Sequence, residues 1–280
     1  MRRKGERGTH SIICAPPVRA GGVKSLYSVC EWLSRLGRSR ISPFWGTTLA
    51  SWFDHRCKLY DGSYNPDVLI YPEIFQPHLD GVRYQVCFAV GKYQSIADHA
   101  DVTVCKSADT VSWVTAQHPR MATVLIAPSI DRSIFEYDGR TKKDLICYMT
   151  TPRKHPETAE RLRHRYGDRF CEIRDRSERE VAEILKAAKV FVWRGNDQEG
   201  SPRPPKEALV AGCLVVGLKS DLSDRYLTNF GIQCATVDEL LEMAGEALRM
   251  PMPTAEERGV VRDKKEEMAD WLELMSSLFA

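Results

Sequence analysis

The sequence of 280 residues contains no hydrophobic run long enough to cross a membrane as a helix. Its longest apolar stretch, ALVAGCLVVGL (208–218), falls well short of the roughly 18 residues that a membrane-spanning helix needs. The basic start, MRRKGERGTH, leads into a short apolar stretch that ends at Pro16-Pro17, whereas a signal peptide carries roughly 7–15 apolar residues there. We therefore expect a soluble protein of the cytoplasm.

The chain also lacks an excess of charge of either sign. Its 40 Lys and Arg residues nearly balance 38 Asp and Glu residues, and the net charge is +2. No strong overall charge therefore points to nucleic acid or to an acidic membrane as a partner. The hydrophobic fraction of 43% and the charged fraction of 28% are close to the globular averages of roughly 45–50% and about 25%. This composition excludes a disordered chain, a collagen-like fibre and a coiled coil.

Nine cysteines are present, but the C-x-x-C spacing is absent. The number is odd, and most of the cysteines lie inside apolar runs such as SIICA, VCFAV and LICYM. Zinc sites and disulfide frameworks use closely spaced cysteines in repeated patterns. The sequence therefore predicts free, buried thiols in a reducing compartment and no metal site.

Short apolar runs alternate with helical patterns along almost the whole chain, which is typical of parallel sheets with crossover helices. In the first half, strands are expected at 11–15, 67–71, 84–90, 101–105 and 122–127, and helices at 22–37 and 107–118. In the second half, strands are expected at 145–149, 169–174, 190–194, 214–218 and 232–235, and helices at 156–166, 177–189, 204–212 and 221–230.

Residues 132–144, between the two series, are polar, contain Gly139 and lack periodicity, so we interpret them as a linker. We expect an α/β fold of two Rossmann-like, doubly wound domains, 1–138 and 139–280, that face each other across a cleft. The C-terminal helix can pack back on the N-terminal domain. In open parallel sheets, ligands bind outside the carboxyl ends of the strands, where helix N-termini present free N–H groups.

The most informative segment is VFVWRGNDQEGSPRPPKEALVAGCLVVG (190–217). A buried strand is followed by a polar loop, and a helix then opens at Pro204-Pro205. Glu199 is expected on the loop and Glu207 in the first helical turn, both at the carboxyl edge of the sheet. Taken alone, Glu207 could be a carboxylate that the positive end of the helix dipole stabilises, and Glu199 could be a solvated loop residue.

This segment resembles the signature of the retaining nucleotide-sugar glycosyltransferases of family 4, which have the GT-B fold. Their pattern is Glu-Gly, a Pro, a second Glu, a helix of small residues, a Gly and an apolar strand. This sequence keeps Glu199-Gly200, Pro205, Glu207-Ala208, Ala211-Gly212 and Val215-Val216.

Two further segments resemble the same family. The stretch 15–37 is similar to the family's first strand, Gly-Gly turn and first helix, so Gly21 and Gly22 would let backbone approach the donor diphosphate. A Gly pair also occurs in tight turns for steric reasons alone. The stretch 145–162 resembles the opening strand of the second domain and the basic pair that grips the donor phosphates, here Arg153 and Lys154. In isolation these two could be exposed loop cations.

The resemblance implies a glycosyltransferase that moves a sugar from a nucleoside diphosphate donor to an acceptor with retention, without a cofactor or an obligatory metal. Arg153 and Lys154 would stabilise the leaving diphosphate, and Glu199 would hold the sugar hydroxyls; these three form the expected catalytic set. Glu207 would accept hydrogen bonds from the donor ribose.

The backbone at Gly200 and Ser201 would complete the expected donor pocket. The expected donor-binding set is therefore Gly21, Gly22, Arg153, Lys154, Glu199, Gly200, Ser201 and Glu207.

The sequence departs from the family in its short length and in the lack of a clear counterpart to the family's N-domain His, so we assign no catalytic His. It contains no D-x-D, which argues against the metal-bridged diphosphate site of the other common glycosyltransferase fold. A nucleotide-sugar epimerase of the same fold and a non-catalytic nucleotide-sugar-binding subunit are the alternatives. The sequence does not identify the acceptor, which is a glycan, a lipid-linked phosphate, a small molecule or a modified nucleic acid.

Overall fold

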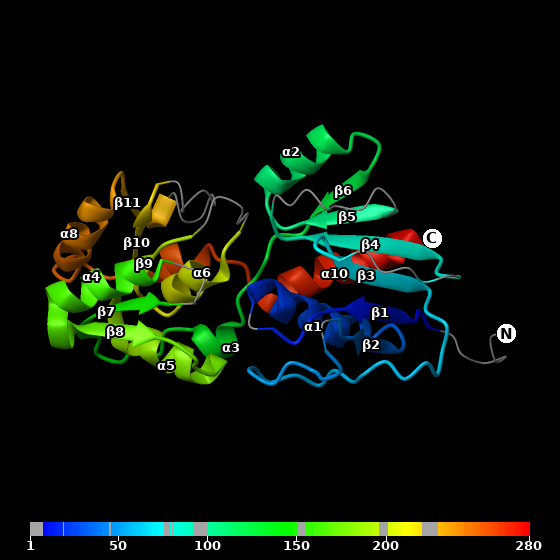
Figure 1. The fold of residues 1–280 in the computed structure, drawn as a ribbon, viewed down its shortest axis with the longest axis horizontal. Helices are drawn as coiled ribbons and strands as arrows, with labels where there is room; N and C mark the ends of the chain where they lie inside the picture. The colour runs from blue at the N-terminus through cyan, green and yellow to red at the C-terminus, as the bar shows by residue number, and fades with distance from the viewer. Residues whose placement is uncertain are drawn as a thin grey trace. The chain divides into compact units, whose positions relative to one another are not determined.

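The computed structural model describes residues 8–18, 20–44, 46–75, 79, 81–91, 100–150, 155–195, 201–219 and 229–280. The chain forms two compact units: the first comprises Met1–Pro128 and Lys265–Ala280, and the second comprises Ser129–Lys264. Each unit has its own sheet with helices packed against it, as Figure 1 shows.

The first unit contains β1 (Ser11–Cys14), α1 (Gly21–Leu33), β2 (Ser39–Ser42), β3 (Val68–Pro72), β4 (Tyr84–Ala89), β5 (Val102–Cys105), α2 (Ala108–Gln117), β6 (Ala122–Leu125) and α10 (Lys264–Leu278). Its six strands pair in the order β2-β1-β3-β4-β5-β6, and every pairing is parallel. The chain moves from β1 to one side for β2 and to the other side for β3, so the topological switch point lies between β1 and β3.

The second unit contains α3 (Arg132–Phe135), β7 (Lys143–Met149), α4 (Pro156–Tyr166), β8 (Phe170–Ile173), α5 (Glu178–Ala187), β9 (Ala188–Trp193), α6 (Arg203–Val210), β10 (Leu214–Leu218), β11 (Ile232–Cys234), α8 (Val237–Ala247) and α9 (Ala255–Gly259). Its five strands pair in the order β11-β10-β9-β7-β8, again all parallel. Here the switch point lies between β7 and β9.

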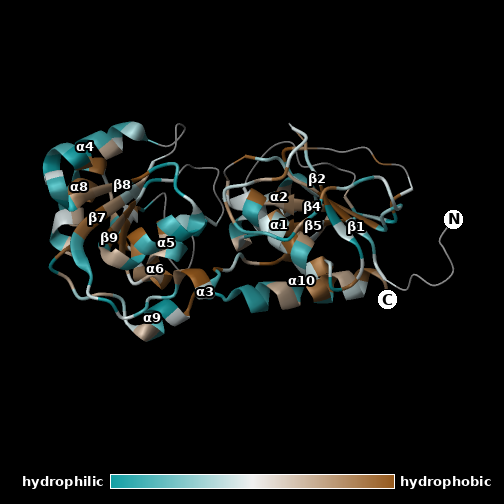
Figure 2. Cartoon of the chain, turned by 90° about the horizontal axis from the view of Figure 1, so that it is seen from below, coloured by the Kyte–Doolittle hydropathy of each residue, from teal (hydrophilic) through white to brown (hydrophobic). Residues whose placement is uncertain are grey.

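Strands β1, β3, β9 and β10 are nearly continuous apolar runs, as expected for parallel strands whose sheet has helices on both faces. All four residues of β1 and all five of β3 are buried. Figure 2 shows this contrast, with brown strands inside the units and a mostly teal helix α4 on the outside. The structure therefore confirms the expected α/β class with two Rossmann-like units.

Two features of the chain differ from the sequence expectation. Strand β2 was not expected, because its sequence SRIS is mostly polar and only Ile41 supplies an apolar side chain to the core. The expected linker 132–144 is not a linker in the structure, because α3 and the start of β7 occupy it. Phe135 of α3 is buried in the core of the second unit. The units accordingly divide between Pro128 and Ser129, whereas the sequence placed the boundary between 138 and 139.

Helix α10, which follows the whole second unit in sequence, packs into the core of the first unit. Its buried residues, Glu267, Trp271, Leu274 and Met275, recur at helical spacing on one face. Trp271 is fully buried, and its ring stacks on Phe88 of β4 at a centroid distance of 6.0 Å. Helix α10 is therefore part of the hydrophobic core of the first unit.

A buried ion pair joins α10 to the end of β5. The Nζ atom of Lys106 donates to Oε1 of Glu267 at 2.6 Å, and their side chains are only 2% and 1% exposed. Lys106 also lies over the Phe88 ring, 5.1 Å from its centroid. Removing one partner of such a pair leaves a buried charge without its counter-ion, which is far more costly than losing a surface pair.

None of the helices in the described part of the chain combines the length and apolar character that a membrane crossing requires.

We expect the substitution Glu267→Ala to lower the free energy of unfolding by about 3–5 kcal/mol, because Lys106 would remain charged and buried. Urea unfolding of the purified protein measures this change. The matched control is Glu273→Ala on the exposed face of the same helix, for which we expect a change within about 0.5 kcal/mol. Equal, small effects of both substitutions would contradict the assigned role of the pair.

Candidate functional site

The carboxyl edge of the second sheet, at the switch point between β7 and β9, is where a doubly wound fold binds its ligand. Strand β7 ends at Met149 and β9 at Trp193. The segments that follow these two strands lead to α4 and α6, so the N-termini of both helices lie at this edge. Aligned peptide dipoles and free N–H groups make such helix starts receptive to anions.

Helix α6 carries Glu207, one of the expected donor-binding residues. The Glu207 side chain is buried, and its Oε1 atom lies 3.6 Å from Nε of Arg203, one helical turn earlier. The expectation that Glu207 lies in the first helical turn is wrong, because α6 begins at Arg203 and Glu207 is its fifth residue. Since the dipole effect falls off within the first turn, dipole stabilisation alone does not account for a carboxylate at this position.

Ser201, also in the expected donor set, lies just before the start of α6. Its hydroxyl oxygen accepts a hydrogen bond from Nζ of Lys206 at 2.6 Å. Lys206 is only 1% exposed, so a buried ammonium group holds the residue that precedes the helix. Ser201 is thereby fixed relative to Glu207, the next residue after Lys206.

The glycine of the Ala211-Gly212 pair has a structural role. Gly212 has a φ of +81°, which is the left-handed region, and the N–H of Cys213 donates back to the carbonyl of Ala208 to end the helix. A Cβ atom on Gly212 would lie only 3.1 Å from the side chains of Lys142 and Tyr137. This part of the motif therefore follows from helix termination and packing, without reference to a ligand.

A further group of polar residues, not expected from the sequence, connects the two sides of the switch point. His155 precedes α4, and its Nε2 atom lies 3.1 Å from the carbonyl oxygen of Gly195, just after β9. The guanidinium of Arg194 lies 3.4 and 3.5 Å from the two ring nitrogens of His155 and 3.4 Å from the hydroxyl of Thr158 in α4.

Four of the expected site residues, Arg153, Lys154, Glu199 and Gly200, lie outside the described residues, and so does most of the helix expected at 221–230. The first two directly precede His155 in sequence, and the last two lie between Gly195 and Ser201. The described members in the second unit are Ser201, two residues before α6, and Glu207, within α6. Among the residues that the structure describes, no group of three or more His, Cys, Asp or Glu side chains could hold a metal ion.

The remaining candidates, Gly21 and Gly22, open helix α1 of the first unit, on the segment that follows β1. A Cβ atom on Gly22 would be 3.4 Å from the side chain of Val90, which follows β4. The glycine turn thus packs against the end of β4. The structure places both glycines at the carboxyl edge of the first sheet.

Glu73 lies at the same edge, directly after β3, and is not among the site residues expected from the sequence. Its Oε1 atom accepts the backbone N–H groups of Val90 and Gly91 at 3.1 and 3.2 Å, and the residue is 1% exposed. Burial raises the pKa of this carboxyl group from 4.5 to about 7, although the two backbone hydrogen bonds oppose the shift. Glu73 therefore fixes the backbone segment against which Gly22 packs.

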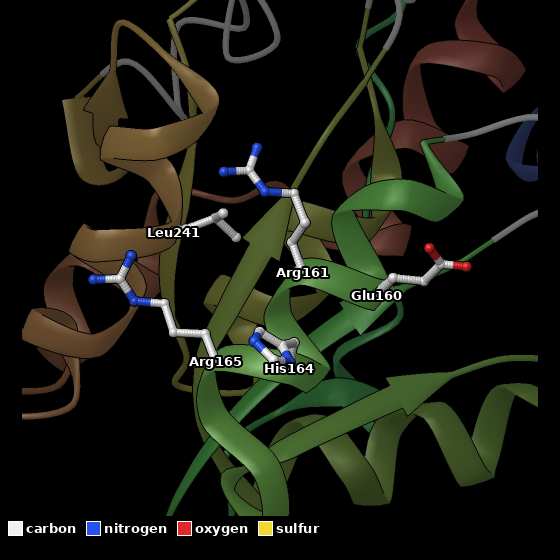
Figure 3. Close-up of a pocket in the computed structure, with 5 residues that line it drawn as sticks. All are labelled: Glu160, Arg161, His164, Arg165 and Leu241. Atoms are coloured by element: carbon white, nitrogen blue, oxygen red, sulfur yellow. The ribbon is translucent and has the colours of Figure 1, made fainter.

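A shallow hollow of about 640 Å³ lies elsewhere on the second unit, between α4 and α8. Glu160, Arg161, His164 and Arg165 of α4 and Leu241 of α8 line it, and Figure 3 shows the two arginines on either side of Leu241. Arg161 forms an ion pair with Asp238 of α8. None of the expected site residues that the structure describes lines this hollow.

No protein-family model matches the chain, and neither does any curated protein sequence. Solved structures do match over almost the full length. The sucrose-phosphate synthase of Thermosynechococcus elongatus has a TM-score of 0.68 at 12% identity, with 97% of this chain and 99% of that chain covered. HepE of Anabaena, in complex with UDP-glucose, has a TM-score of 0.68 at 11% identity, with 96% and 100% covered. AviGT4, a glycosyltransferase involved in avilamycin A biosynthesis, has a TM-score of 0.61 at 14% identity, with 96% and 97% covered.

The fold is GT-B. These neighbours are glycosyltransferases of that fold, and the parallel sheets of six and five strands match theirs. At 10–14% identity the likeness concerns the fold and carries no site residue from those proteins to this chain.

Because the carboxyl group of Glu73 holds its proton more tightly in the folded protein than in the unfolded chain, its contribution to stability is present below about pH 4.5 and is lost as the pH rises through about 7. The side chain of a Glu73→Gln variant does not titrate. We expect the stability of this variant relative to wild type to rise by about 2–3 kcal/mol between pH 5 and pH 8. Urea unfolding at several pH values measures it. A difference independent of pH would contradict the assignment.

Proposed function

We propose that this protein is a glycosyltransferase that moves a sugar from a nucleoside diphosphate sugar to an acceptor with retention of configuration. The observation that carries the proposal is the buried carboxylate of Glu207 on α6, beside the switch point of a GT-B fold. It occupies the position of the second Glu in the pattern that 190–217 shares with the retaining glycosyltransferases of family 4. Three of the matching structures are complexes of HepE with UDP, with UDP and glucose, or with UDP-glucose, which supports a nucleotide sugar as the donor.

In the proposed site, Arg153 and Lys154 follow β7 and offset the negative charge that develops on the leaving diphosphate. A guanidinium group binds phosphate oxygens through paired N–H donors, and an ammonium group adds a compact charge. Stabilising charge that appears only in the transition state is what accelerates transfer. In this proposal the nucleoside diphosphate departs without the help of a metal ion as the sugar passes to the acceptor, and the protein needs no cofactor.

The proposed carboxylates bind the two ends of the donor. Glu207 accepts hydrogen bonds from the ribose hydroxyls, and Glu199 holds the sugar hydroxyls beside the backbone of Gly200 and Ser201. The hydrogen bond from Lys206 to Ser201 and the pair of Arg203 with Glu207 support this arrangement, because they fix the described side of the pocket before a donor arrives.

The first unit is the proposed acceptor half, and its Gly21 and Gly22 allow close approach of backbone to the donor diphosphate. The contact of Gly22 with Val90 and the hydrogen bonds from Val90 and Gly91 to Glu73 support a fixed edge there. All nine cysteines are free thiols, which suits the reducing cytoplasm in which we place the protein.

The donor site is tested with a thermal-shift panel of nucleoside diphosphates and their sugars, since a ligand that binds the native state raises Tm. We expect at least one nucleoside diphosphate to stabilise the wild-type protein. We expect Glu207→Gln to weaken its binding by about 1.5–3 kcal/mol, the range of a hydrogen bond to a charged group, as measured by calorimetry.

The matched control is Glu136→Gln. Glu136 is also paired with an arginine four residues earlier, Arg132, at 2.5 Å, but it caps the end of α3 outside the proposed site. We expect this variant to bind the nucleotide with wild-type affinity. Unchanged affinity in Glu207→Gln would remove Glu207 from the site, and a wild-type protein that binds no member of the panel would overturn the proposed function.

A second test concerns the metal. Because the proposed site uses Arg153 and Lys154 where other enzymes use a cation, we expect EDTA to leave nucleotide binding and donor turnover unchanged. The same panel and a donor-hydrolysis assay with and without EDTA measure this. A complete loss of nucleotide binding or donor turnover in EDTA, reversed by added Mg²⁺ or Mn²⁺, would contradict the proposed independence from metal.

A further inference from the structure

His155 is held in a backbone conformation that histidine rarely adopts. Its φ and ψ of 41° and 57° lie in the left-handed region, which is unfavourable for a residue with a Cβ atom and suits glycine. Among the described residues, the other non-glycine residue with a positive φ is Asp175, with a φ of 51°. Such conformations persist only where surrounding contacts enforce them, and they concentrate at functional sites.

The contacts of the imidazole ring explain what holds it there. Nε2 lies 3.1 Å from the carbonyl oxygen of Gly195, and Nδ1 lies 3.2 Å from Oε1 of Glu157 in the first turn of α4. The carbonyl oxygen of His155 accepts a hydrogen bond from the hydroxyl of Tyr148, in β7, at 3.3 Å. The residue thus connects the end of β7, the start of α4 and the end of β9.

Arg194 supports the ring from the side of β9. Its Nη2 atom lies 3.4 and 3.5 Å from the two ring nitrogens, and its Nη1 atom lies 3.4 Å from the hydroxyl of Thr158. Among the residues that the structure describes, the charged groups that contact the imidazole are the guanidinium of Arg194 and the carboxylate of Glu157. Together they restrict the ring to a position between the two segments.

The contact between His155 and Gly195 joins two residues that are close in sequence to the proposed donor-binding residues. His155 directly follows Arg153 and Lys154, and Gly195 comes four residues before Glu199. The hydrogen bond from the ring to Gly195 therefore joins the residue that follows the proposed cations in sequence to a residue four positions before the proposed sugar-binding carboxylate. Holding binding groups in place beforehand removes part of the ordering cost of binding.

We propose that His155 is a positioning residue of the donor site, held by Arg194, which locks the segment after β7 to the segment after β9 across the switch point. This inference rests on the proposed function, since it assigns His155 a part in binding the nucleoside diphosphate.

The deciding variant is His155→Gly, which removes the ring and relieves the left-handed strain. We expect Tm to stay within about 2 °C of wild type, because relief of strain offsets the lost hydrogen bonds. We expect the Kd for the nucleoside diphosphate with the largest thermal shift in the wild-type panel to rise roughly tenfold, or about 1.4 kcal/mol. The matched control is Asp175→Gly, which relieves the same kind of strain away from the contact between His155 and Gly195 and should leave Kd unchanged.

The role of Arg194 is tested with Arg194→Met, alone and combined with His155→Gly. If Arg194 acts through the imidazole, the substitution Arg194→Met raises Kd in the wild-type background. In the His155→Gly background the same substitution has no further effect on Kd. Additive effects would overturn that part of the proposal.

Binding by His155→Gly within twofold of wild type, or a Kd that rises only together with a fall in Tm of several degrees, would overturn the positioning role. Either result leaves the proposed function intact, because the wild-type protein still binds the nucleotide. A wild-type protein that binds no nucleoside diphosphate would overturn both.

Discussion

Parallel pairing of β7 with β9 is the constraint on which the candidate site depends. The two strands are separated in sequence by α4, β8 and α5, yet Ile146 lies in register with Val190 and Tyr148 with Val192. Because parallel strands end at one edge, this pairing places the segment after Met149 beside the segment after Trp193. The contact between His155 and Gly195 depends on this pairing, and so does the position of the start of α6. If another strand lay between β7 and β9, these groups would be separated.

Much of the fold was predictable from the sequence because strands buried on both faces must be apolar throughout. The segments LICYM, VFVW and LVVGL of the second unit are strands in the structure, and Ser177 with Glu180 forms the capping box that their spacing indicated. The same rule explains why β2 was not predicted, because its sequence SRIS is mostly polar. This strand pairs with β1 through backbone hydrogen bonds, which leave no signal in the hydropathy pattern. Helix α3 has only four residues, too short for a helical period to be visible.

The candidate site was predictable only where its residues are close in sequence. Ser201 and Glu207 belong to one loop and helix, so their spacing carried information, although the helix starts earlier than the prolines suggested. His155 and Arg194 are separated by 39 residues, and only the strand order brings them together. Lys206 was missed for another reason: a lysine in a helix is ordinarily solvated, and its burial becomes evident only when the packing around Ser201 is seen. Glu73 was missed similarly, since its hydrogen bonds go to the backbone of Val90 and Gly91, which follow a different strand.

The place of α10 has a consequence for how the chain is made. Phe88 and Lys106 are synthesised early, but Trp271 and Glu267, which cover and neutralise them, leave the ribosome only after the whole second unit. The first unit is therefore discontinuous in sequence, and its core is complete only when the last residues of the chain are present. A single proteolytic cut anywhere within 129–264 separates α10 from the rest of the core to which it belongs, so no such cut releases the first unit as an intact fragment.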